Sequence, residues 1–322
     1  MTPRITSLNR PDVEREDLPV DVLVVGAGPA GLACAIQLKR DLDKRGDDER
    51  TVLVIDKAEE IGHHTLSGAV MNPRGIEELF PDWRERGFPV EAAVGDDWAE
   101  VLRPGGTQIA LRGALCPPQL RNHGNLIVSL NKVTRWMAEQ AEELGIEVYA
   151  GFPAAELCQD ADGRVTGVIT RDSGIAKDGA EKGTFEPGMR IQASVTVMAE
   201  GTRGSLAKQL FKDERLGLMT GRNPQTYGTG IKEIWQVTPE VGREMFGKVL
   251  HTGGYPLDTK AYGGSFIYGV SEDRLALGFV VGLDQGDAKL DPHALFVQWK
   301  QHPRIAGMLA GGKVLRYGAK TV

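Results

Sequence analysis

The sequence is poor in cysteine and lacks the common motifs of metal and hydrolytic chemistry. It has 3 cysteines among 322 residues, Cys34, Cys116 and Cys158, and no Cys-x-x-Cys pair. Thiols this few and this far apart cannot form a zinc site or an iron–sulfur cluster by themselves, and they fit a reducing compartment. The hydrolase motifs Gly-x-Ser-x-Gly and His-Glu-x-x-His are also missing. The sequence therefore indicates chemistry carried by a bound cofactor rather than by a hydrolytic side-chain constellation.

Long apolar runs and positive net charge are lacking as well. No segment approaches the about 18 consecutive apolar residues of a membrane-spanning helix. The net charge is −6, so we expect no nucleic acid partner. Residues 1–20 contain three prolines and many charges. They resemble neither a signal peptide nor a transit peptide, and we expect them to form a loosely held polar arm.

Glycine, in contrast, is abundant, with 41 residues, almost twice the average usage of about 7%. The most informative glycines follow an apolar strand predicted over residues 21–25 and precede a predicted helix. This turn consists of Gly26, Ala27, Gly28, Pro29, Ala30 and Gly31. Strand, Gly-x-Gly-x-x-Gly and helix together form the dinucleotide-binding pattern of Rossmann-like folds.

Each glycine of the pattern has a distinct physical role. Gly26 permits the tight turn after the strand, Gly28 lets a pyrophosphate approach the backbone, and Gly31 lets the helix pack against the strand. The helix N-terminus then favours the negative phosphates. A second predicted strand ends in Asp56, 25 residues after Gly31, where its carboxylate can bind a ribose hydroxyl. The alternative is a glycine-rich turn that binds no nucleotide.

The pattern alone does not separate NAD from FAD. Two later features favour FAD: a loop of small residues over 62–69, which includes Ser67 and Gly68, and a strand that ends at Glu200-Gly201. We expect the loop to run beneath the cofactor and the second turn to reach the pyrophosphate. His63 and His64 are adjacent and have no third ligand at metal-binding spacing, so we do not expect a metal there.

The order of predicted elements indicates an α/β fold in two parts. A Rossmann-like FAD-binding domain of the glutathione-reductase type is predicted over residues 21–220, with a β-hairpin turning at Asp162-Gly163. From residue 221 to 322 the composition changes: the sequence has β-like runs rich in Gly, Tyr and Thr, followed by two predicted helices. These runs predict an inserted, mainly antiparallel sheet that forms the substrate wall.

The residues support a resemblance to a known family. From about residue 20 to 318 the chain resembles the N-terminal part of electron-transfer flavoprotein–ubiquinone oxidoreductase. The segments that carry it are GAGPAGLACA, IGHHTLSGAVMNPRGIEELFPDW, NHGNLIVSLNKVTRWMAEQAEELGIEVYAGFPAAE, DSGIAKDGAEKGTFEPGM, VTVMAEGTRGSLAKQL, PQTYGTGIKEIW, HTGGYPLD, YGGSFIYG and LGFVVGLD. Most of these lie outside the shared glycine turn, so the resemblance is specific.

The resemblance implies an electron-transferring-flavoprotein dehydrogenase that delivers electrons from the electron-transfer flavoprotein to ubiquinone. It implies that the glycine turn and Asp56 hold the ADP half of FAD, with Glu200 and Gly201 closing that site. The quinone-binding sheet is then lined at Tyr262, Gly263 and Gly264, followed by Ser265. Bare backbone suits a flat headgroup; without the resemblance, a bulge or turn would be the favoured interpretation.

The same resemblance implies a membrane surface as partner. An apolar hairpin, here about residues 101–118, dips into one leaflet, although Arg103 and Arg112 make it less apolar. We expect a peripheral or monotopic protein at the cytoplasmic face of a bacterial inner membrane. Family members continue with a domain that holds a four-iron four-sulfur cluster, which this chain does not include.

Two alternatives remain open at the level of sequence. One is a geranylgeranyl-reductase-like or monooxygenase-like flavoprotein, which shares the glycine turns and would use NADPH or another reductant. The other is a non-catalytic flavin-binding remnant, because the C-terminal part of the family is absent.

Overall fold

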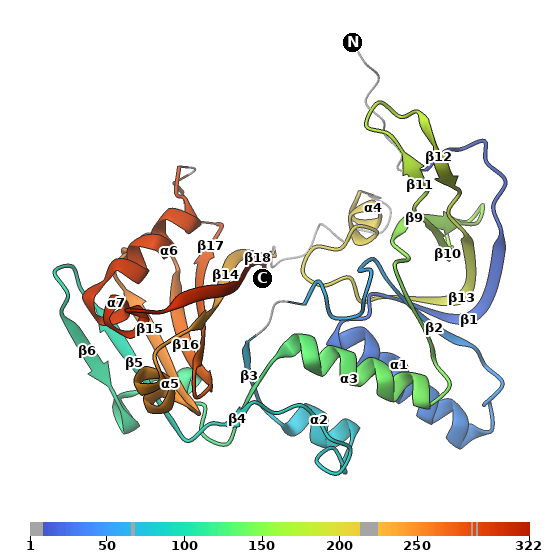
Figure 1. The fold of residues 1–322 in the computed structure, drawn as a ribbon. Helices are drawn as coiled ribbons and strands as arrows, with labels where there is room; N and C mark the ends of the chain where they lie inside the picture. Colours follow the sequence, from blue (N-terminus) through green and yellow to red (C-terminus); the bar gives the residue numbers. More distant parts are fainter. Residues whose placement is uncertain (1–8, 66–67, 213–224, 285, 288) are drawn as a thin grey trace. The chain divides into compact units, whose positions relative to one another are not determined.

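A computed structural model describes residues 9–65, 68–212, 225–284, 286–287 and 289–322. The chain forms two compact units (Figure 1). Unit 1 comprises Met1–Thr65 and Thr134–Asn223, and unit 2 comprises Leu66–Val133 and Pro224–Val322. The α/β class and the Rossmann-like part predicted from the sequence are confirmed.

The division differs from the predicted domain boundaries in one respect. Residues 66–133, expected within the FAD-binding domain, group with the C-terminal unit. The reason is strand pairing: β5 (Asp96–Leu102) lies parallel to β15 (Lys248–Gly254), with Leu250 opposite Trp98. The predicted boundary at 220 and 221 falls outside the described residues.

Unit 1 is built on a six-stranded sheet. Its order is β8-β2-β1-β13-β10-β9, in which the first four strands are parallel and the last two antiparallel. Strand β2 is almost fully buried, and β1 is buried over its last three residues, as expected where a parallel sheet is covered on both faces. The strands are β1 (Asp17–Val25), β2 (Val52–Asp56), β8 (Glu147–Ala150), β9 (Ala154–Gln159), β10 (Val165–Thr170) and β13 (Arg190–Met198).

Helix α1 (Pro29–Arg45) follows β1 directly. Proline at its first position suits the helix start, and it ends at Gly46 in the left-handed conformation, with Lys44 and Arg45 favourable at the negative end of the dipole. Helix α3 (Leu130–Glu143), which carries the unit boundary in its first turn, buries Trp136 and Met137 as its apolar stripe predicts.

The remaining elements of unit 1 are short. The predicted hairpin at Asp162-Gly163 is confirmed as β9–β10. The polar segment after it pairs as a second hairpin. These elements are β11 (Ser173–Ile175), β12 (Glu181–Glu186) and α4 (Ala207–Phe211).

Unit 2 is built on a seven-stranded sheet with the order β18-β14-β17-β16-β15-β5-β6. It is antiparallel except for the pair β5–β15. The predicted β-runs are confirmed, whereas the C-terminal strand β18 was not foreseen. Its strands are β5 and β15 with β6 (Gln108–Leu111), β14 (Gly228–Gln236), β16 (Gly263–Ser271), β17 (Arg274–Gly282) and β18 (Lys313–Thr321).

The two faces of this sheet are covered differently. On one face, Phe296 and Trp299 pack on Phe279 in a core with α6 and α7. On the other, a small sheet of order β3-β7-β4 packs against Val249 and Tyr268. The covering elements are α6 (Pro292–Gln301), α7 (Pro303–Leu309), β3 (Ala69–Met71), β4 (Ala92–Ala93) and β7 (Leu126–Val128), with α2 (Arg74–Leu79) and α5 (Pro239–Met245) at the ends of strands.

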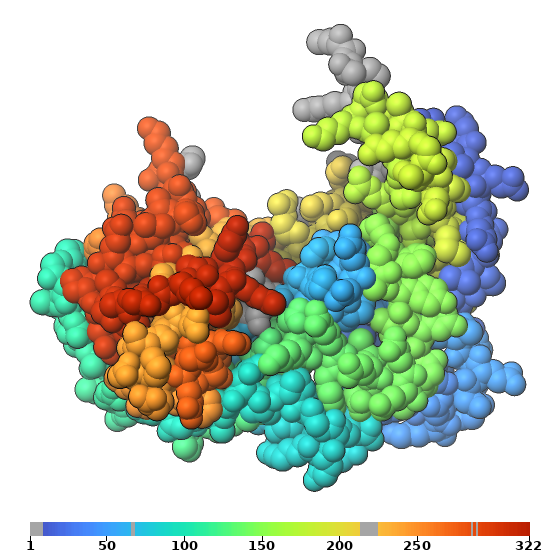
Figure 2. All heavy atoms as spheres, viewed as in Figure 1, coloured from blue at the N-terminus to red at the C-terminus, as the bar shows by residue number. Residues whose placement is uncertain are grey.

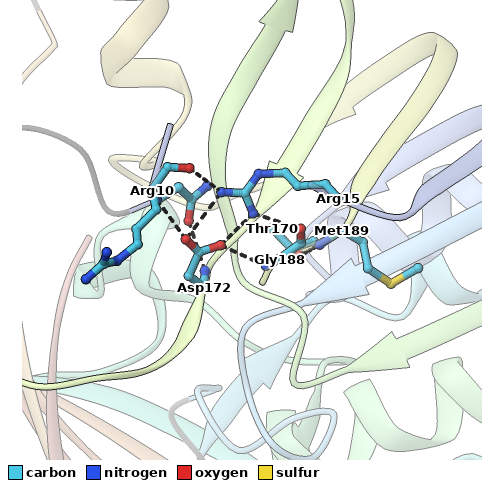
Figure 3. A network of polar contacts seen from close by, with 7 residues as sticks. Arg10, Arg15, Thr170, Asp172, Gly188 and Met189 are labelled. Carbon is cyan, nitrogen blue, oxygen red and sulfur yellow. Dashed lines mark hydrogen bonds and ion pairs between the residues drawn. The ribbon is translucent and has the colours of Figure 1, made fainter. Parts of the chain in front are cut away.

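The polar N-terminal segment is held more firmly than its composition suggests. Arg15 and Asp172 are both buried and form an ion pair, and the backbone N–H of Arg10 donates to the same carboxylate at 2.7 Å (Figure 3). The N–H of Gly188 donates to it at 2.8 Å. Strand β1 also begins at Asp17 rather than at residue 21. The expectation of a loose arm over residues 1–20 is therefore wrong from residue 9 onward.

We predict that Asp172→Asn opens this segment. Removing one partner of a buried ion pair costs about 3–5 kcal/mol, because the other charge stays buried without compensation. Asp17→Asn is the matched control, since Asp17 forms an exposed ion pair with Arg190 that is worth about 0–1 kcal/mol. Hydrogen exchange of the amides of residues 9–20 and 170–190 measures both opening free energies. Equal losses of opening free energy in the two variants would show that the ion pair of Asp172 does not hold this segment in place.

The wild-type protein should show the same opening in acid. Burial opposes ionisation of Asp172, but the hydrogen bonds from Arg15, Gly188 and Arg10 outweigh it and hold the pKa of this carboxyl below its usual value. Because the pKa of Asp172 is lower in the folded than in the unfolded protein, its ionised carboxylate stabilises the fold at pH values above the unfolded pKa of about 3.9. This stabilisation is lost as the pH falls through the folded-state pKa. After correction for the intrinsic exchange rate, the opening free energy of this segment should therefore fall below about pH 4.

Candidate functional site

The glycine turn of unit 1 fits the end of β13 closely. Gly26 has φ of 111°, and a Cβ atom there would lie 2.3 Å from the carbonyl oxygen of Ala199. A Cβ on Gly31 would lie 2.0 Å from the carbonyl oxygen of Gly26 and 3.0 Å from Cβ of Ala199. Only glycine fits at either position, since backbone atoms cannot give way.

Gly28 is different because it faces open space. No atom lies within 4 Å of the position that its Cβ would take. Gly28 is also the N-cap of α1, has no side-chain cap, and is followed by a first turn without acidic residues. A pyrophosphate site requires open space, a helix N-terminus whose dipole is not capped by a side chain, and no negative charge nearby. The residues present therefore fit the phosphates of FAD.

Asp56 ties the turn to strand β2. Its Oδ2 accepts a hydrogen bond from the N–H of Ala27 at 2.8 Å, and its Oδ1 accepts one from the N–H of Ala58 at 2.8 Å. Each carboxylate oxygen keeps a further lone pair. The carboxylate can therefore accept from a ribose hydroxyl while it holds the turn in place.

The second turn begins where β13 ends. The carboxylate of Glu200 accepts hydrogen bonds from the N–H groups of Ser205, Leu206 and Ala207 at 2.7–3.1 Å. Its side chain thus caps the segment that leads into α4. A Cβ on Gly201 would meet no atom within 4 Å, and its φ is 78°. Gly201 therefore offers open backbone, as Gly28 does.

The loop predicted to follow Asp56 contributes two site residues, Ser67 and Gly68. Ser67 is not among the described residues. Gly68 has φ of 79° and accepts a hydrogen bond at its carbonyl oxygen from Nζ of Lys232 at 2.8 Å. A Cβ on Gly68 would lie 2.8 Å from Cβ of Ala276, so glycine lets this loop lie directly on β17.

The predicted quinone wall lies on strand β16. Gly263 and Gly264 pair in regular register with Val281 and Val280, so they form neither a bulge nor a turn. Neither has a positive φ. The ladder to β15 ends before them, at Thr252 opposite Ser265. Tyr262, at the strand end, has 84% of its surface exposed.

A Cβ atom would have different effects at the two glycines. On Gly263 it would lie 2.2 Å from the carbonyl oxygen of Val280, so only glycine fits. On Gly264 its nearest neighbour would be the carbonyl oxygen of Thr252 at 3.1 Å. A side chain at Gly264 therefore occupies space above the sheet without breaking the strand.

The segment predicted to enter a membrane forms an edge hairpin followed by two 3₁₀ turns, Gly113–Leu115 and Pro118–Leu120. Strands β5 and β6 pair antiparallel at the sheet edge, and Figure 2 shows this hairpin in teal at the surface of unit 2. Ile109 is 43% and Leu115 is 73% exposed. Arg112 lies over the ring of Trp98 at 4.4 Å and pairs with Asp96. Among the described residues, no helix is both long and apolar enough to cross a membrane.

Comparison with known families matches both units. Residues 24–82 match a NAD(P)-binding Rossmann-like domain, residues 78–252 match an FAD binding domain, and residues 227–322 match "ETF-QO, ubiquinone-binding". The chain belongs to the FAD-binding domain family. The stretch 227–322 contains all three predicted quinone-wall residues, Tyr262, Gly263 and Gly264.

Curated relatives confirm the resemblance seen in the sequence. The mitochondrial electron transfer flavoprotein-ubiquinone oxidoreductases of Oryza sativa subsp. japonica and Sus scrofa are 44% and 46% identical to this chain. The matches cover 96% and 97% of this chain, and 52% and 50% of those proteins. The protein of Homo sapiens is 46% identical over 97% of this chain and 50% of its own length. The chain thus spans about half the length of the curated relatives it matches.

Solved structures share the fold at low sequence identity. A geranylgeranyl bacteriochlorophyll reductase-like protein from Thermoplasma acidophilum has a TM-score of 0.64 at 16% identity, over 95% of this chain and 66% of its own. Aklavinone-11 hydroxylase, solved with FAD and aklavinone, has a TM-score of 0.58 at 20% identity, over 94% and 53%. These likenesses show the fold alone and leave the cofactor and the reaction open.

Sequence reasoning missed one group of polar residues. Lys232 and His251 lie on the sheet face that carries Gly264, but each stands alone in the sequence between ordinary strand residues. No spacing rule relates them, because strand pairing alone brings β14 and β15 into one sheet.

We predict that Gly28→Val folds but does not retain FAD. The valine would fill the space where the pyrophosphate approaches, whereas the backbone itself has no positive φ to strain. Gly31→Val is the contrasting variant, because its side chain would collide with backbone at 2.0 Å and should prevent folding. Circular dichroism measures folding, and absorbance of the purified protein near the flavin bands measures FAD content. Undiminished flavin in folded Gly28→Val protein would overturn the assignment.

Proposed function

We propose that this chain is part of an FAD-dependent oxidoreductase that passes electrons from reduced electron-transfer flavoprotein to ubiquinone. The observation that supports it most directly is the match of residues 227–322 to the ubiquinone-binding model, in a chain that also matches an FAD binding domain. The relatives at 44–46% identity carry this activity in their names. Because the chain spans about half of them, the activity of the whole protein is a proposal for this one.

In this proposal, bound FAD would supply the two-electron redox chemistry between the reduced flavoprotein and the quinone. The chain's own residues bind and orient the two molecules. Gly28 and the N-terminus of α1 hold the pyrophosphate of FAD, and Asp56 accepts a hydrogen bond from a ribose hydroxyl. Gly201 offers open backbone to the pyrophosphate from the end of β13. Tyr262, Gly263 and Gly264 form the quinone wall, where bare backbone lets a flat ring lie against the strand.

Further partners and the location follow from the same relationship. We propose that a four-iron four-sulfur cluster belongs to the part of the relatives that this chain does not span. We also propose peripheral or monotopic association with the cytoplasmic face of a bacterial inner membrane, through the exposed apolar residues of 101–118. The names of the relatives place those proteins in mitochondria.

We predict that Gly264→Val slows quinone reduction at least tenfold, about 1.4 kcal/mol of barrier. The valine would occupy the volume above β16 that a headgroup requires, and no φ-dependent strain contributes. The FAD-loaded protein is reduced anaerobically and mixed with ubiquinone-1, and flavin reoxidation is followed by absorbance. Unchanged rates would remove Gly264 from the site.

Two further reductants complete this experiment. Reduced electron-transfer flavoprotein should reduce the bound FAD of wild type and Gly264→Val alike, because the substitution lies on the quinone wall. NADPH should not reduce it. Rapid reduction by NADPH, with no response to the flavoprotein, would favour the reductase-like alternative instead.

We predict that replacing both Ile109 and Leu115 with Asp weakens binding to vesicles of phosphatidylethanolamine and phosphatidylglycerol. Exposed apolar side chains favour insertion at the headgroup boundary, and carboxylates oppose it. Leu283→Asp is the matched control, because Leu283 is 49% exposed outside this hairpin. Cosedimentation with vesicles measures binding. Substitution is preferable to deletion of 104–118, which would remove β6 and the buried Cys116. Equal binding of both variants and wild type would exclude the hairpin as the contact.

A further inference from the structure

A stretch of sequence without acidic residues begins in the edge hairpin of unit 2. Although 44 of the 322 residues are acidic, none lies between Glu100 and Glu139. The hairpin and the turns that follow it contain Arg103, Arg112 and Arg121 instead. This surface therefore carries positive charge in a protein whose net charge is −6. A local reversal of sign of this kind favours a negatively charged partner.

The same hairpin exposes apolar side chains. Val101 on β5 lies directly opposite Ile109 on β6, so the two side chains share one face of the sheet. They are 37% and 43% exposed. Leu115, in the turn after β6, is 73% exposed, more than any other leucine, isoleucine or valine of the described residues. Exposed apolar residues beside arginines are typical of segments that lie at a membrane surface.

Arg121 is anchored directly beside Leu115. Its Nε donates to the carbonyl oxygen of Cys116 at 3.0 Å, and its Nη2 donates to the carbonyl oxygen of Ala114 at 3.3 Å. These two carbonyl groups belong to the residues before and after Leu115. The Cys116 side chain is buried, which fixes the turn on the protein. The backbone on both sides of the exposed leucine therefore holds a guanidinium group in place.

The charge of Arg121 is available to a ligand. Among the described residues, no carboxylate forms an ion pair with Arg121, whereas Arg112 lies 3.3 Å from Asp96. The nearby carboxylate of Asp97 accepts the backbone N–H of Asn122 at 2.8 Å. Arginine has five N–H donors, and the two carbonyl groups occupy two of them. Three donors in a planar, charged group suit a phosphate, which arginine binds through two parallel hydrogen bonds.

We propose that this surface binds the headgroup phosphates of anionic phospholipids in a bilayer. Its residues are Val101, Arg103, Ile109, Leu115 and Arg121. The assignment rests on the proposed membrane association, and it adds the class of lipid and the side chain that recognises it. Leu115 enters the headgroup boundary, where its apolar side chain leaves water. Arg121 stays beside it at the level of the phosphates, and the negative surface potential of anionic lipids favours both arginines.

A charge-neutralising substitution tests the role of Arg121. Arg121→Gln removes the charge and keeps an amide that can still donate to a carbonyl oxygen of the turn. Arg316→Gln is the charge-matched control, because Arg316 is exposed on β18, at the opposite edge of the same sheet. Arg103→Gln is a second test, because this exposed side chain takes no part in the hydrogen bonds around Leu115. It removes a charge without changing the turn.

Cosedimentation measures binding of the full chain to two kinds of vesicle. One contains phosphatidylethanolamine with phosphatidylglycerol, and the other contains phosphatidylethanolamine with phosphatidylcholine. We expect the wild type to bind the anionic vesicles roughly tenfold more tightly, and 1 M salt to remove this difference because the Debye length falls to about 3 Å. Arg121→Gln should bind anionic vesicles about fivefold more weakly, the effect of one basic residue at an anionic surface. Arg103→Gln should lose a similar factor, and Arg316→Gln should bind as the wild type does.

The outcomes separate this inference from the proposed function. Equal binding of the wild type to both kinds of vesicle would overturn the recognition of anionic lipid, and the membrane association would stand. The same conclusion follows if Arg121→Gln and Arg103→Gln bind anionic vesicles as Arg316→Gln does. Binding to neither kind of vesicle would overturn the membrane contact itself. If, in addition, Arg121→Gln weakened binding to purified electron-transfer flavoprotein, the arginine would serve a protein partner instead. Circular dichroism of each variant verifies its fold.

Discussion

The structure of unit 1 depends on how closely the turn after β1 approaches the end of β13. Gly26 and Gly31 both lie against Ala199, at distances where a side chain would collide with backbone or with Cβ. This contact sets where α1 begins and leaves its N-terminus open at Gly28. Asp56 adds a third connection, because its carboxylate binds the N–H of Ala27 from the end of β2. The ends of β1, β2 and β13 thereby meet beside the open N-terminus of α1.

Glycines also determine the packing in unit 2. Gly278 makes room for the Phe266 ring, and Gly68 makes room for the loop on Ala276. Gly253 faces open space instead, and a Cβ on Gly264 would meet only the carbonyl oxygen of Thr252, at 3.1 Å. The same residue type therefore serves tight packing at some positions and exposes backbone at others, and burial and distance distinguish the two uses.

Several buried charges of the described residues are paired within the protein. Arg15 with Asp172, Lys300 with Glu233, and Arg304 with Glu100 each hold a segment or helix against a sheet. Such pairs are compensated within the protein and provide no site for a ligand. Lys232 differs because its described partner is a carbonyl oxygen.

The sequence by itself determined the glycine turn and the class of fold, because these depend on local order: a strand, a turn and a helix in immediate succession. The family followed from distinctive segments along the chain, most of them outside that turn. The β-runs of the C-terminal part followed from alternation and composition in the same way. The tertiary structure alone decided three matters. It assigned 66–133 to unit 2 through the pairing of β5 with β15, fixed residues 9–16 through the buried Asp172, and aligned Lys232 with His251 across four strands. Each depends on contacts between residues far apart in the chain, where local pattern carries no information about which partner is chosen.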